Sequence, residues 1–205
     1  MLFRSIDLDL VKGKTTGITG ESGTGKTTLI RLISGQISGG GKVLVNDKEL
    51  QTCSLTSYRE KIGFVGQEPL LFHGTIRDNL LIASPDCSRE KLDKIITQVQ
   101  LDAYIRTLSL GLDTVIGEDS RNISTGQKQR IALARILLKE PAMLILDEPA
   151  TGLDRENERS FIELIKSVKK DKIVLIITHR KIPLEICDEV YCLEKGRLLQ
   201  AAPFA

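Results

Sequence analysis

The sequence predicts an α/β fold with a mostly parallel central sheet and an inserted block of helices. Short apolar runs recur between longer stretches of helical spacing, which is the pattern of a sheet covered by helices. The segment 68–139 has no comparable apolar run and is predicted to be helical. A chain of 205 residues can bury one sizeable core. We therefore expect one domain, 1–205, with a core formed by 1–67 and 140–205 and a helical subdomain at 68–139.

Five short runs are the candidate strands. Parallel strands are covered on both faces, so they read as continuous apolar runs instead of alternating ones. The runs predicted to form buried strands are 43–45, 62–65, 143–146 and 173–177, and residues 15–19 are a plausible further strand.

The helices are predicted from apolar residues three and four positions apart. Within the inserted segment this spacing favours helices at 76–82, 89–99 and 124–138. After Asp154 another helix carries acidic residues in its first turn, lysines at its end and one apolar stripe, formed by Phe161, Leu164, Ile165 and Val168. We expect this stripe to pack on the sheet.

Composition excludes several classes of function. The chain has 29 Lys and Arg residues and 27 Asp and Glu residues, which gives a net charge of +2. Because this charge is close to zero, we expect no nucleic-acid partner. The four cysteines lack C-x-x-C spacing and no signal peptide precedes them, which favours reduced thiols in a cytosolic protein. No apolar run approaches the roughly 20 residues that cross a bilayer, so we do not expect this chain to span a membrane.

A glycine-rich turn after the first strand has the P-loop pattern G-x-x-x-x-G-K-[ST] and opens a helix. Its glycines let successive N–H groups point inward, and the new helix adds its positive dipole end, so the turn suits a polyphosphate such as ATP. Lys26 would neutralise the β- and γ-phosphates, and the Thr27 hydroxyl would help hold Mg²⁺. A plain glycine-rich turn with an exposed lysine is the alternative. The predicted nucleotide-binding residues here are Gly20, Glu21, Ser22, Gly23, Thr24, Gly25, Lys26, Thr27 and Thr28.

Two adjacent carboxylates follow the run 143–146. Asp147 and Glu148 would stand at the tip of a buried strand, where α/β sheets place their chemistry. Asp147 is expected to reach Mg²⁺, and Glu148 to polarise the water that attacks the γ-phosphate. A strand that simply enters a polar loop gives the same pattern, and it is the upstream P-loop that favours the functional interpretation.

A second anion site is predicted at the start of the helix 124–138. Ser124 followed by Gln127 is a capping-box pattern. Gly126 leaves the helix N-terminus bare, with N–H groups and a hydroxyl available to a phosphate. A well-capped helix without a ligand is the alternative.

The segment Ile123-Ser-Thr-Gly-Gln-Lys-Gln-Arg130 resembles the signature sequence of ABC transporter ATPases. The resemblance implies a P-loop NTPase (RecA-like) core with a mostly parallel sheet and an inserted ABC α-helical subdomain. It also implies that Ser124, Gly126 and Gln127 contact the γ-phosphate of nucleotide held by a partner's P-loop. Thr125 stands where the family usually has a glycine, so this contact departs from the family pattern.

Other segments resemble further elements of the family. Gln67, in Phe-Val-Gly-Gln-Glu-Pro, resembles the Q-loop glutamine that senses Mg²⁺. The segment 150–154 resembles the D-loop that crosses the dimer interface, although Asp154 could equally be only the N-cap of the next helix. His179 resembles the switch histidine that contacts the γ-phosphate. The resemblance thus implies the catalytic residues Lys26, Gln67, Glu148 and His179 and the metal ligands Thr27, Gln67 and Asp147.

The segments 71–79 and 114–118 resemble those of exporter-type members. The resemblance implies MgATP hydrolysis that drives export, a second ABC ATPase domain as partner, and a transmembrane domain in the same parent chain or in trans. The chain would then lie at the cytoplasmic face of a membrane. A non-transport ABC ATPase of ribosomes or chromosomes, and a regulatory module with weak hydrolysis, are the alternatives.

The family's adenine-stacking aromatic lies further upstream of the P-loop than Met1 does here, and Phe3 is expected in the core. Either the chain is an excised domain or weaker contacts hold adenine.

Overall fold

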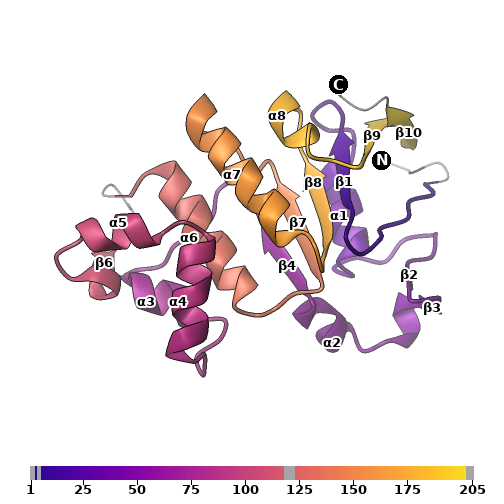
Figure 1. Cartoon of the computed structure of the whole chain (residues 1–205). Coiled ribbons are helices and arrows are strands. Elements are labelled where there is room, and N and C mark those ends of the chain that lie inside the picture. The colour runs from indigo at the N-terminus through magenta and orange to yellow at the C-terminus, as the bar shows by residue number, and fades with distance from the viewer. Residues whose placement is uncertain (1–2, 4–5, 118–122, 202–205) are drawn as a thin grey trace.

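A six-stranded sheet runs through the computed structural model, which describes residues 3, 6–117 and 123–201 (Figure 1). The strand order is β10-β9-β1-β8-β7-β4. Five strands are parallel, and only β10 runs antiparallel, against β9. The bounds are β1 Thr15–Thr19, β4 Ile62–Val65, β7 Met143–Asp147, β8 Ile173–Ile177, β9 Glu189–Glu194 and β10 Arg197–Ala201. The predicted α/β fold with a mostly parallel sheet is confirmed.

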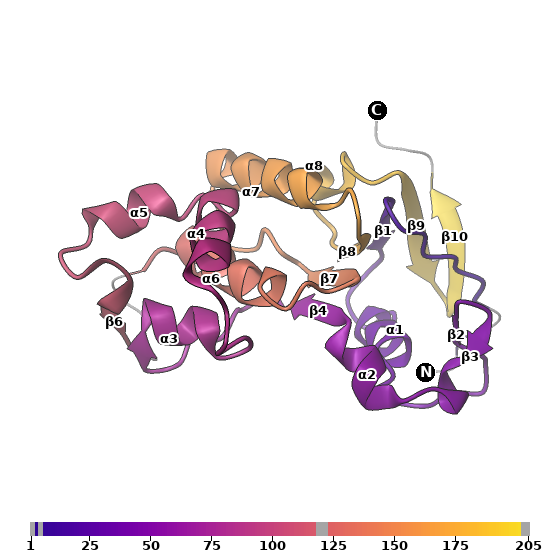
Figure 2. The same ribbon diagram turned by 60° about the horizontal axis from the view of Figure 1, so that its bottom comes forward.

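Helices cover both faces of this sheet (Figure 2). Alternate residues of each central strand face opposite ways. Leu144 and Leu146 of β7 pack in one apolar cluster with α6 (Thr125–Leu137) and α7 (Arg155–Val168), whereas Met143 and Ile145 pack in a second cluster with α1 (Lys26–Ile33). The predicted apolar stripe of α7 is buried in the first cluster. The sheet therefore has an apolar layer on each side, as the continuous apolar runs predicted.

The chain between β4 and β7 is mainly helical. It contains α3 (Ile76–Leu81), α4 (Arg89–Gln98), α5 (Asp102–Thr107), the short helix η2 (Gly111–Asp113) and α6. The helices predicted at 76–82, 89–99 and 124–138 are confirmed. α5 was not predicted, and neither was the small antiparallel pair β5 (Gly74–Thr75) and β6 (Val115–Ile116). The predicted limits of the helical subdomain, residues 68 and 139, stay a prediction.

One predicted strand is wrong. The run 43–45 is not a buried strand of the main sheet: β2 (Leu44–Val45) forms a separate antiparallel hairpin with β3 (Lys48–Glu49), and Leu44 is 57% exposed. The physical reason is the turn between them, since Asn46 and Asp47 both adopt positive φ, 48° and 64°. Such a two-residue turn sends the chain straight back on itself. The short helices η1 (Leu50–Thr52) and α2 (Leu55–Glu60) follow.

Strands β9 and β10 were not predicted from the sequence. They form a hairpin at the edge of the sheet, joined by Lys195 and Gly196 at φ 47° and 79°. β9 contains only the short apolar run 190–193, and β10 is largely exposed and has no apolar run longer than two residues, so neither resembles a long strand that is covered on both faces. The one-turn helix α8 (Lys181–Leu184) precedes them.

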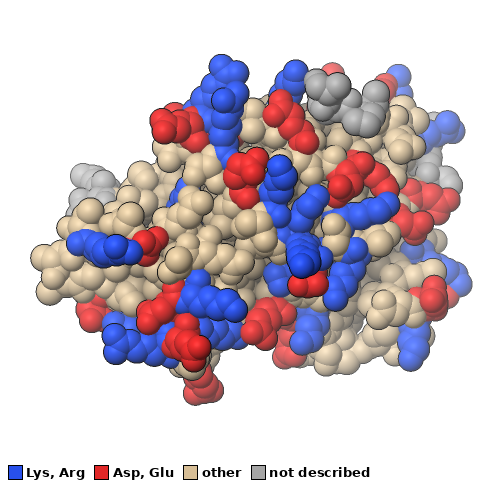
Figure 3. All heavy atoms as spheres, viewed as in Figure 1, with Lys and Arg blue, Asp and Glu red and all other residues tan. Residues whose placement is uncertain are grey.

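Several residues given no chemical role are accounted for by packing. The four cysteines are free thiols, and burial raises the pKa of Cys187 to about 12, which keeps it protonated and inert. Phe3 packs against the cluster around α1, as predicted. Among the described residues no helix is long and apolar enough to cross a bilayer. Lysine, arginine and acidic side chains are interspersed on the face that Figure 3 shows.

Candidate active site

Four neighbouring parallel strands end at the same edge of the sheet, and each is followed by a predicted site segment. β1 leads into the P-loop, β8 into Thr178 and His179, β7 ends with Asp147 before Glu148, and β4 precedes Gln67. The register pairs Asp147 with Ile177. Because carboxyl ends of parallel strands meet at one edge, residues far apart in the sequence are brought together here.

The P-loop depends on glycine at its two ends. Gly20 has φ 147°, and a Cβ there would lie 2.6 Å from the Leu193 carbonyl oxygen. Gly25 has φ 107° and is the N-cap of α1. Between them, a Cβ at Gly23 would meet no atom within 4 Å. The loop therefore curves back toward the sheet at one end, opens a helix at the other, and leaves open space in its middle.

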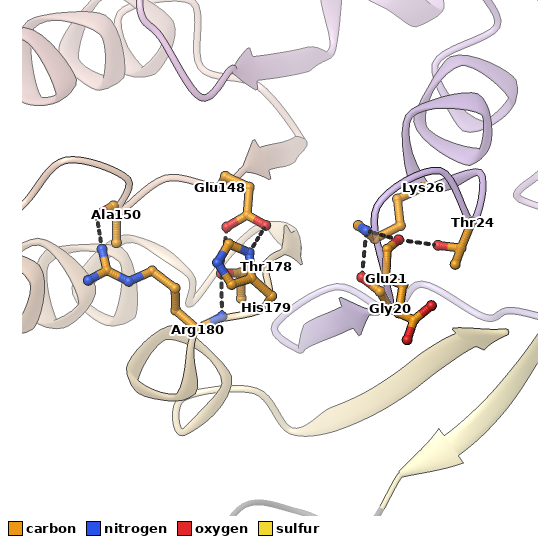
Figure 4. A network of polar contacts seen from close by, with 9 residues as sticks. All are labelled: Gly20, Glu21, Thr24, Lys26, Glu148, Ala150, Thr178, His179 and Arg180. Carbon is orange, nitrogen blue, oxygen red and sulfur yellow. Dashed lines mark hydrogen bonds and ion pairs between the residues drawn. The ribbon is translucent and has the colours of Figure 1, made fainter.

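Polar side chains of this loop bind its own backbone (Figure 4). Lys26 Nζ donates to the carbonyl oxygens of Gly20, at 2.6 Å, and Glu21, at 2.8 Å. Thr24 Oγ1 donates to the Glu21 carbonyl at 2.9 Å. Thr27 and Thr28 are exposed in the first turn of α1. The ammonium group thus lies against the loop mouth, where a phosphate could replace the carbonyl oxygens as its partner.

Asp147 is half-buried at the end of β7. Burial raises the pKa of its carboxyl group, the neighbouring Glu148 raises it further, and Lys26 lowers it. A cation beside Asp147 would compensate its burial.

Glu148 is held on both carboxylate oxygens (Figure 4). Thr178 Oγ1 donates to Oε2 at 2.9 Å, and His179 Nδ1 lies 2.7 Å from Oε1. The Glu148 side chain is only 12% exposed. Its backbone has φ 48°, a conformation that costs free energy in a residue other than glycine, and its N–H donates to the Ile177 carbonyl at 2.7 Å. Neighbouring structure therefore fixes the carboxylate in place.

His179 is itself 72% exposed. An ionised carboxylate only accepts hydrogen bonds, so Nδ1 carries the proton in its contact with Glu148. The contact through Nδ1 leaves Nε2 on the side of the ring away from Glu148, where a protonated Nε2 could donate to a phosphate.

Gln67 is exposed after β4. Its carbonyl oxygen accepts a hydrogen bond of 3.3 Å from Nε2 of Gln129, a fully buried residue of α6. The loop after β4 is therefore tied to the long helix of the inserted segment.

The residues 123–127, here named the signature turn, start α6. Ser124 Oγ accepts from the Gln127 N–H at 3.3 Å, and Gln127 Oε1 accepts from the Ser124 N–H at 2.9 Å, which confirms the predicted capping box. Ser124 and Thr125 are exposed. The Thr125 methyl lies against Gly152, since a Cβ on that glycine would be 3.3 Å from Cγ2.

The signature turn and the P-loop lie apart within one chain. Figures 1 and 2 both show β7 between α6 and α1, which pack in different apolar clusters. The two predicted phosphate-binding elements are thus exposed at different places, and the structure does not bring Ser124, Gly126 and Gln127 to the P-loop of their own chain.

Three residues of this region were not predicted: Thr178, Arg180 and Glu158. Thr178 could have been found as the hydroxyl between a buried strand and His179. The ion pair of Arg180 with Glu158, 3.1 Å long, joins separate elements and has no local sequence signal. Asp154 does cap α7, accepting from the N–H groups of Glu156 and Asn157.

The residues present fit MgATP. The loop offers open space and an ammonium group, and Thr27 and Asp147 supply the oxygen ligands that Mg²⁺ prefers. In the described part of the chain no group of three or more His, Cys, Asp or Glu side chains could hold a metal by itself.

Comparison with known proteins identifies the family to which the chain is similar. The family model described as ABC transporter matches residues 3–151. The chain is 34% identical over 203 residues to multidrug resistance protein 1 of Entamoeba histolytica, covering 97% of this chain and 16% of the relative. It is 33% identical over 200 residues to the glutathione/L-cysteine transport system ATP-binding/permease protein CydD of Escherichia coli, covering 98% and 34%. It is 36% identical over 202 residues to the ATP-dependent lipid A-core flippase of Pectobacterium atrosepticum, covering 98% and 35%.

A solved structure, that of a bacterial Atm1-family ABC exporter with ATP bound, superimposes with a TM-score of 0.89 at 29% identity. The match covers 98% of this chain and 36% of that one. The chain thus spans about a third or less of the length of these relatives. The comparisons confirm the predicted fold class and family resemblance.

Proposed function

The chain belongs to the ABC transporter family and is an ATPase domain of that family, and from this premise we propose that two such domains close around MgATP and drive export through a transmembrane domain. In each nucleotide site, one chain supplies the P-loop and the other supplies the signature turn. Loss of the γ-phosphate removes the contact that favours the closed pair, so hydrolysis reopens it.

The site residues divide the work of hydrolysis. Lys26 and the N–H groups of the P-loop bind the phosphates, and Thr27, Gln67 and Asp147 would hold Mg²⁺, which neutralises phosphate charge when bound. Glu148 polarises the attacking water and accepts its proton, while His179 holds Glu148 through Nδ1 and contacts the γ-phosphate. Water oxygen bonds to the γ-phosphorus as the bond to the β,γ-bridging oxygen breaks, which releases phosphate and ADP.

One observation carries the two-chain site: Ser124 and Thr125 of the signature turn are exposed, and β7 lies between α6 and α1 (Figure 2). Nucleotide seated on Lys26 can meet the N-terminus of α6 only if a second molecule presents it. The capped helix end suits an anion because its first N–H groups and its dipole point outward.

Export through a membrane partner is supported by the relatives. The proteins compared above are named as a flippase, an ATP-binding/permease protein and an ABC exporter, and this chain corresponds to about a third of their length. We propose that the membrane-spanning part lies in the same parent chain or in a partner, and that this domain lies at the cytoplasmic face.

The dimer is tested by light scattering during size-exclusion chromatography of the Glu148→Gln variant, which should retain ATP. A dimer is expected with saturating MgATP and a monomer without it. A matched variant that adds Ser124→Arg should bind nucleotide yet remain monomeric, because the bulky side chain blocks the signature turn. Glu148→Gln that stays monomeric in saturating ATP would contradict the proposed function.

A further inference from the structure

Arg180 makes the most buried ion pair in the described part of the chain. Its guanidinium lies 3.1 Å from Oε2 of Glu158, whose side chain is 4% exposed; the other ion pairs join side chains that are each more than a tenth exposed. Glu158 Oε1 has no hydrogen-bond partner. A buried carboxylate is costly unless it is paired, so Glu158 on α7 depends on Arg180.

The same guanidinium binds a second element. It donates a hydrogen bond to the carbonyl oxygen of Ala150, a residue that is 1% exposed. Figure 4 shows the Arg180 side chain extended toward Ala150 and away from Glu148. A planar guanidinium can serve a carboxylate and a carbonyl at once, which the single ammonium of lysine does less well.

The backbone of Arg180 is linked to the carboxylate half of the site. Its N–H donates to Thr178 Oγ1 at 3.1 Å, and the same hydroxyl donates to Glu148 Oε2 at 2.9 Å. The three residues 178–180 therefore hold the Glu148 carboxylate at one end and the loop 150–154 at the other.

The loop 150–154 in turn lies beside the signature turn. Thr125 packs against Gly152, and Gly126 faces Leu153. Arg180 thus stands between the group that polarises water and the surface that a second copy would contact.

We propose that Arg180 is a positioning residue that fixes the loop 150–154 relative to Glu148, so that assembly of the second chain is transmitted to the water-activating carboxylate. This inference rests on the proposed roles of Glu148 and the two-chain site. We therefore expect changes of Arg180 to alter ATP turnover but not nucleotide binding, because the Arg180 side chain points away from the P-loop.

The test uses the intact protein and the double variant Arg180→Met with Glu158→Met. The double change avoids leaving an unpaired buried charge, so the melting temperature should stay close to that of the parent. We expect kcat for ATP hydrolysis to fall roughly tenfold because the loop is misplaced, while KM for MgATP stays unchanged. Arg180→Lys, which keeps the charge but not the planar fork, should recover part of kcat.

A matched control removes an exposed pair on α5, with Arg106→Gln and Asp102→Asn, and should leave kcat unchanged. An unchanged kcat in the Arg180 and Glu158 double variant overturns the proposal, as does a loss of kcat that merely follows a lower melting temperature. Failure of the proposed function is seen separately, as a Glu148→Gln variant that hydrolyses ATP or does not dimerise.

Discussion

The phosphate half and the carboxylate half of the site differ in how their functional groups are held. In the P-loop, Lys26 and Thr24 bind carbonyl oxygens of their own loop. At the end of β7, Glu148 is nearly buried and both its oxygens are bound by residues that follow the neighbouring strand β8.

Nucleotide binding and ATP hydrolysis are therefore prepared in different ways. The phosphates of a nucleotide can replace the carbonyl oxygens that Lys26 contacts in the P-loop, with little rearrangement elsewhere. The Glu148 carboxylate, by contrast, is already oriented by Thr178 and His179. Fixed polar groups stabilise a transition state without reorganising during the reaction. Changes in the phosphate half should therefore alter affinity, and changes in the carboxylate half should alter turnover.

The largest effect is expected from Glu148→Gln. Loss of the group that accepts the proton from water should lower the ATP turnover number by about 10²–10⁴-fold, with nucleotide affinity retained. Phosphate release measured beside the binding of a fluorescent ATP analogue checks this split. Turnover within a few-fold of the parent would mean that another group activates water.

Lys26→Ala should instead weaken MgATP binding and have a smaller effect on turnover at saturating ATP. Hydrogen bonds to charged groups contribute about 1.5–3 kcal/mol, so the dissociation constant for MgATP should rise roughly tenfold to a hundredfold. Titration calorimetry measures it directly. Lys12→Ala, in an exposed turn before β1, serves as control, and equal affinities for the two variants would refute the role of Lys26.

Thr178→Val and Thr24→Val compare the two halves with the same chemical change. Thr178 is fully buried and joins Glu148 to the Arg180 backbone, so its loss should cost about 1 kcal/mol of stability and lower kcat roughly tenfold. Thr24 binds only the Glu21 carbonyl, so kcat should change less than twofold. If both variants lost turnover equally, the contrast between the halves would be wrong.

Asp147→Asn should give the smallest effect, on stability. The pKa of Asp147 is raised above its ordinary value of 3.8, mainly by burial. Because the pKa of Asp147 is higher in the folded than in the unfolded protein, the protonated carboxyl group stabilises the fold. This stabilisation is fully present below pH 3.8 and is lost as the pH rises through the pKa of the folded protein. At neutral pH the variant should therefore melt slightly higher than the parent without nucleotide, and the gain should shrink toward acid pH. A gain that is independent of pH would contradict this origin.

Local features of the site could be predicted from the sequence because each depends on residues close together in the chain. The P-loop requires glycines at fixed spacing, and the capping box of Ser124 with Gln127 spans one helical turn. The run 43–45 shows the limit of such patterns, since a tight turn at Asn46 and Asp47 decided its structure instead.

Long-range features could not be predicted in the same way. Glu158 could be assigned only to the first turn of a helix, yet it is 3% exposed because Arg180 from the segment after β8 reaches it. The contact of Glu148 with His179, and the position of Gln67 at the same edge of the sheet, depend on the strand order β1-β8-β7-β4, which no single segment of the sequence encodes.

The central claim is that each nucleotide is bound by two chains, and a mixing experiment tests it most directly. Lys26→Ala weakens the P-loop and Ser124→Arg blocks the signature turn. At an ATP concentration that saturates the parent but lies below the dissociation constant of Lys26→Ala, each variant alone should therefore have little ATPase activity. In a mixed dimer one site carries both defects and the other carries neither. We expect mixing of the two variants to restore a substantial part of the ATPase activity. A mixture that shows only the sum of the two separate activities would contradict binding of each nucleotide by two chains.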